Sequence, residues 1–133
     1  MSEDSPRPAI RWGAVAIGAM AGLVVALLAF IFLGISGAVA PGRGEILLLF
    51  IQFLSLVVAG YVAGRLSDAS EIHGGLAALL SAFLSGLISI TSSTVPLAGI
   101  ITLTVVAVVL GSGGGVLARW QRAAAEQPAQ QSD

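Results

Sequence analysis

Cysteine, lysine and asparagine are absent from the 133 residues of this chain, and charged side chains make up only 10% of it. Without cysteine there is no disulfide framework, no thiol nucleophile and no cysteine-based metal site. The 6 basic residues, all of them arginines, nearly balance the 7 acidic residues, so the chain lacks the positive surface that nucleic-acid binding requires. Nucleic acid is therefore not an expected partner.

Apolar side chains take the place of the missing charge. They make up 56% of the residues, and the mean hydropathy is +0.98. A soluble fold of this size cannot bury so much apolar surface, because its ratio of surface to volume is too high. The composition predicts an integral membrane protein whose main partner is the lipid bilayer.

Three long runs without Asp, Glu, Arg or His determine the number of membrane spans. They cover residues 12–42, 46–64 and 74–118. About 20 helical residues cross a hydrocarbon core that is about 30 Å thick. The first two runs therefore supply one helix each, and the third must turn back once, at the turn-like stretch Thr91–Pro96. The sequence predicts an all-α, four-helix transmembrane bundle over residues 12–118, with helices at about 12–35, 46–66, 72–91 and 96–118.

The distribution of arginines predicts the orientation of the bundle. Four spans place both polar tails (residues 1–11 and 119–133) and the loop between the second and third helices on one side of the membrane. The arginines of that side are Arg7, Arg11, Arg65, Arg119 and Arg122, and the opposite side holds Arg43. Positive residues are enriched in cytoplasmic segments, so both termini are expected to be cytoplasmic in a multi-pass protein of the cell membrane, with residues 1–11 disordered.

Aromatic side chains support the same orientation. Trp12, Tyr61 and Trp120 all fall near the predicted cytoplasmic ends of their helices. Amphipathic rings lie at the level of the lipid headgroups, so these three residues are predicted to anchor the bundle at the interface.

Small residues recur at four-residue spacing, which places them on one face of a helix where two backbones can approach closely. The candidates for such helix packing are Gly18, Gly22, Gly60, Gly64, Ala78, Ala82 and Gly86. Gln52 is the candidate for a polar contact between helices, because an unpaired amide is costly in lipid. A chain with 17 glycines also produces such patterns by chance, and the pattern does not separate contacts within one chain from contacts between two copies.

A weak internal repeat suggests a duplicated hairpin. Residues 22–30 match residues 75–83 at five of nine positions, and both segments run in the same direction through the membrane. A duplication would relate the two hairpins by an axis along the membrane normal. The alternative is that apolar sequence of low complexity gives the match without common origin.

The residues that usually carry chemistry are few. No Asp, Glu, Arg or Lys lies inside the predicted spans, where proton-coupled transporters keep an ionisable group. His73, the only histidine, lacks enough neighbouring ligands for a zinc site and is interpreted as an interfacial residue near a helix start, not needed for folding. A pH-responsive role for His73 is the alternative. We expect no enzymatic activity, no catalytic residue, no metal and no cofactor.

The segment Ala59–Arg65, with its Gly-x-x-Ala-Gly-Arg pattern, is followed by His73-Gly74-Gly75-Leu76. This pairing resembles a family of small prokaryotic membrane proteins of unknown function that carry four helices. The resemblance implies the same architecture and adds no activity.

These observations predict a non-enzymatic structural, interaction or accessory subunit of the cell membrane, whose partner is a second copy of the chain or another membrane protein. The alternative is a small channel or transporter that works without an intramembrane charge.

Overall fold

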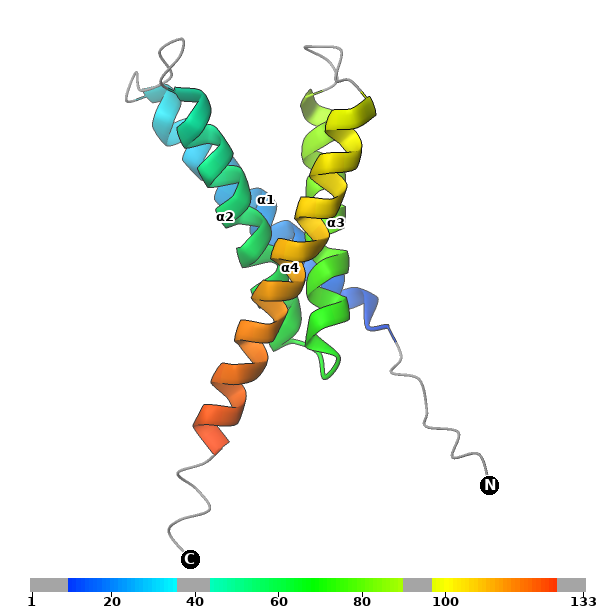
Figure 1. Cartoon of the computed structure of the whole chain (residues 1–133). Coiled ribbons are helices and arrows are strands. Elements are labelled where there is room, and N and C mark those ends of the chain that lie inside the picture. The colour runs from blue at the N-terminus through cyan, green and yellow to red at the C-terminus, as the bar shows by residue number, and fades with distance from the viewer. Residues whose placement is uncertain (1–9, 36–43, 90–96, 127–133) are drawn as a thin grey trace, which may run out of the picture.

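Four helices make up the part of the chain that the computed structural model describes, which is residues 10–35, 44–89 and 97–126 (Figure 1). They are α1 (Trp12–Ile35), α2 (Gly44–Arg65), α3 (Ser70–Ser89) and α4 (Leu97–Glu126). No strand occurs in these residues, so the predicted all-α fold of four helices is confirmed. The helices are rich in leucine and alanine, which have high helix propensity.

The helix bounds follow the prediction closely for α1, α2 and α3, but α4 is longer. It continues to Glu126 instead of ending near residue 118, so the first part of the predicted tail at 119–133 is helical. The polar composition of this part suggested a tail, yet Ala123, Ala124 and Ala125 are strong helix formers with no breaker among them. The predicted turn at 91–96 and residues 1–9 lie outside the described residues.

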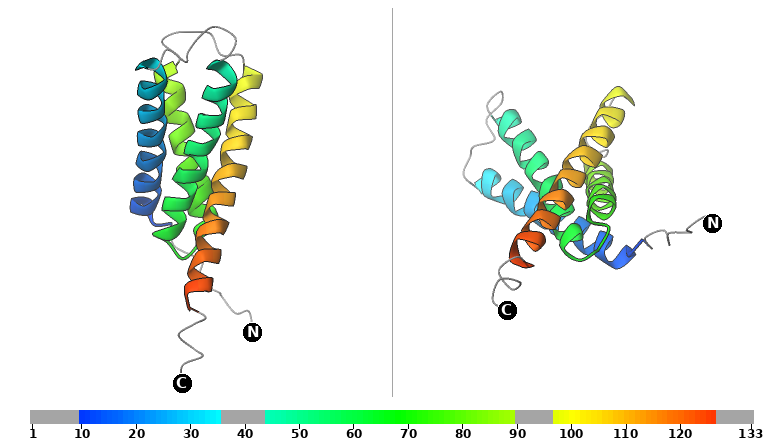
Figure 2. Two further views of the ribbon diagram at one scale, coloured as in Figure 1. Left: turned by 90° about the vertical axis from the view of Figure 1, so that its left-hand side faces the viewer. Right: turned by 60° about the horizontal axis from the view of Figure 1, so that its bottom comes forward.

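The start of α1, the α2–α3 connection (residues 66–69) and the end of α4 lie at the same end of the bundle, which we call the tail end (Figure 1). From there two arms, α1 with α2 and α3 with α4, diverge toward the opposite end (Figures 1 and 2). Helices α2 and α3 each contact the other three helices, whereas α1 and α4 do not contact each other in the described residues. The α2–α3 pair is therefore the centre of the fold.

The contacts between helices do not follow the symmetry that a duplicated hairpin would impose. A two-fold axis along the membrane normal would relate α1 to α3 and α2 to α4, and hence the α2–α3 contact to a contact between α4 and α1. Within the described ranges, α2 contacts α3 but α1 does not contact α4. The two hairpins are thus packed in different ways, whatever the origin of the repeat.

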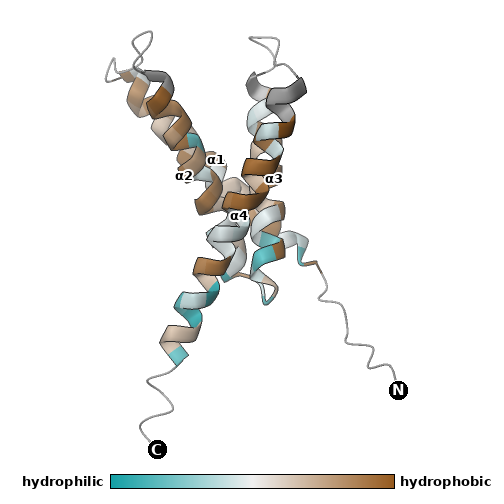
Figure 3. Cartoon of the chain, viewed as in Figure 1, coloured by the Kyte–Doolittle hydropathy of each residue, from teal (hydrophilic) through white to brown (hydrophobic). Residues whose placement is uncertain are grey.

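Small side chains fill the interior, and large apolar side chains point outward. The buried apolar residues are mostly alanines, and the largest fully buried side chains are Leu56, His73 and Val15. In contrast, Phe32 is 71% exposed and Phe50 is 64% exposed. Hydrophobic residues cover both arms, and hydrophilic residues gather at the tail end (Figure 3). This distribution is that of a bundle surrounded by lipid, where close packing rather than hydrophobic burial holds helices together.

Three of the helical segments are long and apolar enough to cross a membrane: Trp12–Ile35, Ile46–Arg65 and Ile101–Glu126. Among the residues that the structure describes, α3 is not one of these segments. It lies in contact with all three spanning candidates.

Candidate functional site

Helix α4 crosses α2 and α3 at a point where glycines bring the backbones into direct contact. A Cβ atom added to Gly60 of α2 would overlap the backbone of Gly111, and one added to Gly64 would lie 2.8 Å from the Cα of Gly115. From α3, a Cβ on Gly74 would lie 2.5 Å from the carbonyl oxygen of Gly111. We call these five residues the glycine crossing. Any side chain at these positions would force the helices apart.

The contact between α1 and α2 is built in the same way. A Cβ added to Gly18 would lie 2.6 Å from the carbonyl oxygen of Ala59, and one added to Gly22 would lie 2.8 Å from that of Ser55. The Gly22 position also lies 3.0 Å from Ser81 Oγ of α3, so three helices meet there. The predicted packing residues of α1 therefore contact α2 within the same chain.

The other predicted packing residues have different surroundings. Ala78 and Ala82 are buried and form a cluster with Leu56 of α2 and Ala107 of α4. A Cβ added to Gly86 would meet no atom within 4 Å among the described residues, so no close approach of a neighbouring helix requires glycine there.

Gln52, the predicted polar contact between helices, is half-buried on α2. The hydrogen bond described at this residue is made by its backbone carbonyl, which accepts from Ser55 Oγ at 2.7 Å. This bond lies within α2 and therefore does not join two helices.

His73 is buried at the tail end, with only 1% of its surface exposed, and it connects two segments of the chain. The backbone N–H of Arg11, just before α1, donates a hydrogen bond to Nε2 of the ring at 2.8 Å. Nδ1 lies 2.7 Å from the carbonyl oxygen of Ala69, just before α3. We call this arrangement of Arg11, Ala69 and His73 the His73 clasp. Both ring nitrogens thus have backbone partners, which the interpretation of His73 as a residue not needed for folding did not include.

The two partners of the ring determine its protonation state. A peptide N–H can only donate, so Nε2 must accept, and a carbonyl can only accept, so Nδ1 must carry the hydrogen and donate. The ring is therefore neutral, with its hydrogen on Nδ1. The first amides of a helix have no acceptor within that helix. His73 supplies such an acceptor for the segment that leads into α1.

Near the end of α4, Arg122 makes hydrogen bonds to the end of α2 and to the α2–α3 connection. Nη2 of Arg122 donates to the carbonyl oxygens of Gly64 and Ser67, each at 2.9 Å. Carbonyls at the C-terminal end of a helix lack intrahelical donors, and a guanidinium group near them is favourable. Arg122 thus caps α2 with a side chain from α4.

Two exposed contacts lie beside this cap. Arg119 forms an ion pair with Glu71 at 3.0 Å, and the hydroxyl of Tyr61 donates to Oε1 of Gln121. The guanidinium carbon of Arg65 lies 5.9 Å from the centre of the Tyr61 ring. The Arg119–Glu71 and Tyr61–Gln121 contacts attach the part of α4 beyond residue 118 to the bundle.

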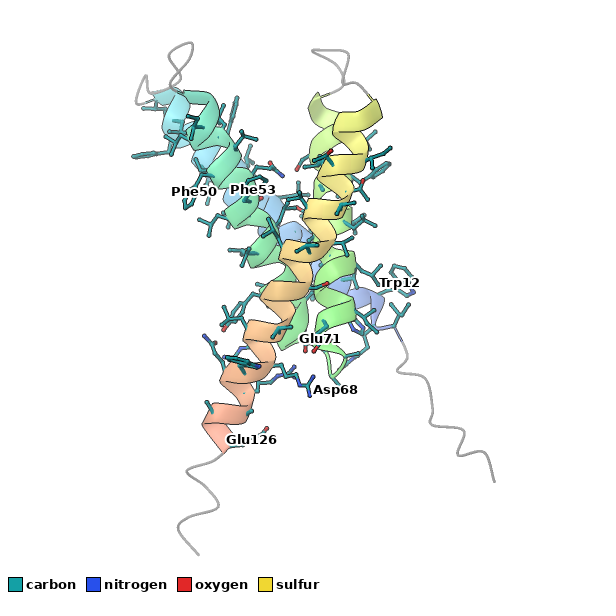
Figure 4. All side chains as sticks on the ribbon, viewed as in Figure 1. Trp12, Phe50, Phe53, Asp68, Glu71 and Glu126 are labelled. Carbon is teal, nitrogen blue, oxygen red and sulfur yellow. The ribbon has the colours of Figure 1, made fainter. Side chains whose placement is uncertain are left out.

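The predicted anchors lie at the tail end. Trp12 is 67% exposed and Trp120 is 71% exposed, whereas Tyr61 is half-buried. Trp12 shares this end with Asp68, Glu71 and Glu126, far from Phe50 on the diverging part of α2 (Figure 4). Indole rings and charges thus mark the same end of the bundle.

An open groove of about 290 Å³ runs beside the start of α1. It is lined by Arg11, Gly13, Ala14, Ile17 and Leu66. The groove leaves no signal in the sequence, because Leu66 belongs to the α2–α3 connection and comes close to α1 only in the folded chain. No group of three His, Asp or Glu side chains that could hold a metal ion occurs in residues 10–35, 44–89 and 97–126.

No protein-family model, no curated protein and no solved structure matches this chain. The resemblance carried by residues 59–65 and 73–76 therefore stays a prediction. What the chain does has to be inferred from its own geometry.

Proposed function

We propose that this chain is a four-span protein of the cell membrane, with both termini in the cytoplasm, and that it acts as a non-enzymatic interaction or accessory subunit. Its partner would be another membrane helix, from a second copy of the chain or from another protein. The observation that carries this proposal is the divergence of the two arms, which leaves large apolar side chains without a partner helix (Figure 1).

On α2, an exposed apolar face toward the opposite end of the bundle is continuous with the face that makes buried contacts. Leu56 of α2 lies in the buried cluster with Ala107 of α4. Residues three to four positions apart share a helix face, so Phe53 and Leu49 extend the Leu56 face toward the opposite end of α2. Phe53 is 39% exposed and Leu49 is 57% exposed. A partner helix seated against them would gain close packing that this chain alone does not provide.

The glycine crossing argues against the alternative of a channel through the middle of the bundle. Backbone atoms of α2, α3 and α4 are in direct contact at Gly60, Gly74 and Gly111. Such contacts leave no width for water between these helices. The proposal of an interaction subunit needs no such passage.

Site-specific photo-crosslinking in native membranes tests the proposal. A photoreactive phenylalanine analogue at Phe53 should give a discrete higher-mass product, because the partner helix packs there. The matched control is the same analogue at Phe32, which is 71% exposed at the end of α1 and should give lipid adducts alone. Mass spectrometry of the product distinguishes a second copy from another protein. Lipid adducts at both positions would refute the proposal.

A further inference from the structure

The groove beside α1 combines one positive charge with apolar walls. Arg11 is the charged residue among the five described residues that line it, and none of these five is a carboxylate. Ile17, which is 55% exposed, and Leu66, which is 43% exposed, form apolar walls. A ligand that fits this groove carries a negative group and an adjoining apolar part.

The His73 clasp positions the arginine. The backbone N–H of Arg11 donates to Nε2 of the buried His73 ring, so the backbone of Arg11 is held against α3. Ala14 and Val15 in turn donate their backbone N–H groups to the carbonyl oxygen of Arg11, at 3.0 and 3.3 Å. Hydrogen bonds at both the N–H and the carbonyl of Arg11 therefore fix the backbone from which the guanidinium side chain extends.

The size of the groove limits what enters it. Pockets that enclose a whole small-molecule ligand have volumes of roughly 300–1,000 Å³. The groove, at about 290 Å³ and open on one side, suits a headgroup but not a complete lipid. Acyl chains attached to that headgroup would run along the apolar surface of α1, where Ile17 lies.

We propose that this groove binds the headgroup of an anionic glycerophospholipid, with the phosphate on the guanidinium of Arg11 and the glycerol against Ile17 and Leu66. The proposal rests on the membrane location given under Proposed function. Arginine recognises phosphate through paired charge-assisted hydrogen bonds. A zwitterionic lipid is bound less well, because none of the described lining residues is a carboxylate that could receive its ammonium group. A free phosphate ion is bound less well, because it leaves the apolar walls uncovered.

Native mass spectrometry of the purified, delipidated protein tests the preference. The protein is mixed with equal amounts of phosphatidylglycerol and phosphatidylcholine that carry identical chains. We expect several-fold more bound phosphatidylglycerol on the parent protein, and a ratio near one for Arg11→Gln. Arg119→Gln is the matched control, because it removes a positive charge from the same end of the bundle outside the groove, and it should keep the parent ratio.

A second variant tests the groove by shape instead of charge. A Cβ added to Gly13, which lines the groove, would meet no atom within 4 Å among the described residues, so Gly13→Leu adds volume there without a clash with them. It should lower the binding of both lipids while the melting temperature stays at the parent value. In a separate arm, excess inorganic phosphate, compared with chloride at equal ionic strength, should not displace phosphatidylglycerol.

Four results would overturn the proposal. They are equal binding of the two lipids by the parent, an unchanged ratio in Arg11→Gln, an equal loss in Arg119→Gln, and displacement by phosphate. None of these results depends on the crosslink at Phe53. Recovery of the protein from soluble rather than membrane fractions would instead refute the membrane location on which both proposals rest.

Discussion

Replacement of His73 by alanine is the sharpest test of the packing at the tail end. The change removes the acceptor of the Arg11 N–H and the donor to the Ala69 carbonyl, and it leaves space where a ring with 1% exposure had been. A buried donor left without a partner costs about 1–3 kcal/mol. We therefore expect His73→Ala to lower the free energy of unfolding in detergent by at least about 1–3 kcal/mol, with the start of α1 released from α3.

Two further variants separate the bonds of the ring. The side-chain oxygen of glutamine lies near the position of Nε2, so His73→Gln retains an acceptor for Arg11. The side-chain nitrogen of asparagine lies near the position of Nδ1, so His73→Asn retains a donor to Ala69. If the bond to α1 dominates, glutamine restores more of the melting temperature than asparagine.

The chain provides its own local reporter for this experiment. Trp12 directly follows Arg11, and Trp120 is the only other tryptophan, so Trp120→Phe leaves a single tryptophan, next to the His73 clasp. The emission of Trp12 should change in His73→Ala and return toward the parent spectrum in His73→Gln. An alanine variant with the parent melting temperature and the parent Trp12 spectrum would refute the role of the clasp.

Gly60→Ala should destabilise the protein by about 1–3 kcal/mol, because the added methyl group overlaps the backbone of α4. Gly86→Ala, the control, should be neutral or stabilising. Equal melting temperatures of the two variants would contradict the glycine crossing. Arg122→Ala should lower the free energy of unfolding by about 1–3 kcal/mol, since it removes the cap of α2. Arg119→Ala should lower it by less than about 1 kcal/mol, because the ion pair of Arg119 is exposed. The reverse order in chemical unfolding would refute the cap. A cysteine introduced at Asp68 should react with a membrane-impermeant thiol reagent only after permeabilisation; reaction in intact cells would reverse the orientation. Liposomes that contain the protein should hold a pH gradient as long as empty ones, and rapid dissipation would favour the channel alternative.

Much of the fold could be predicted because lipid imposes a simple rule on helix length. The apolar runs located four helices, and the small residues identified the face of α1 that meets α2 at Gly18 and the face of α2 that meets α4 at Gly60. The partner of each face could not be predicted, because every helix carries several small residues and the spacing is the same in all of them. The contact of Gly60 with Gly111 joins residues whose proximity depends on the crossing of α4, a three-dimensional property.

The candidate site was mostly hidden from sequence reasoning. The acceptor role of His73 depends on a backbone N–H 62 residues away, and a backbone group leaves no side-chain signal in the sequence. The role of Arg122 was missed for another reason, since a polar segment after a span reads as a tail. The run of Ala123 to Ala125 was the signal that α4 continues, and it would have placed Arg122 on a helix.

The glycine run in α4 has a mechanical consequence. A helix interior with Gly111, Gly113, Gly114 and Gly115 has weak intrinsic stiffness, because each glycine lowers helix stability by roughly 0.5–1 kcal/mol relative to alanine. Gly111, Gly114 and Gly115 are also the positions at which α2 and α3 approach α4 most closely. The direction of α4 beyond residue 115 is therefore governed by its neighbours more than by its own backbone. A partner that changes the spacing of α2 and α3 would therefore change the direction of the part of α4 that follows the glycine run, residues 116–126.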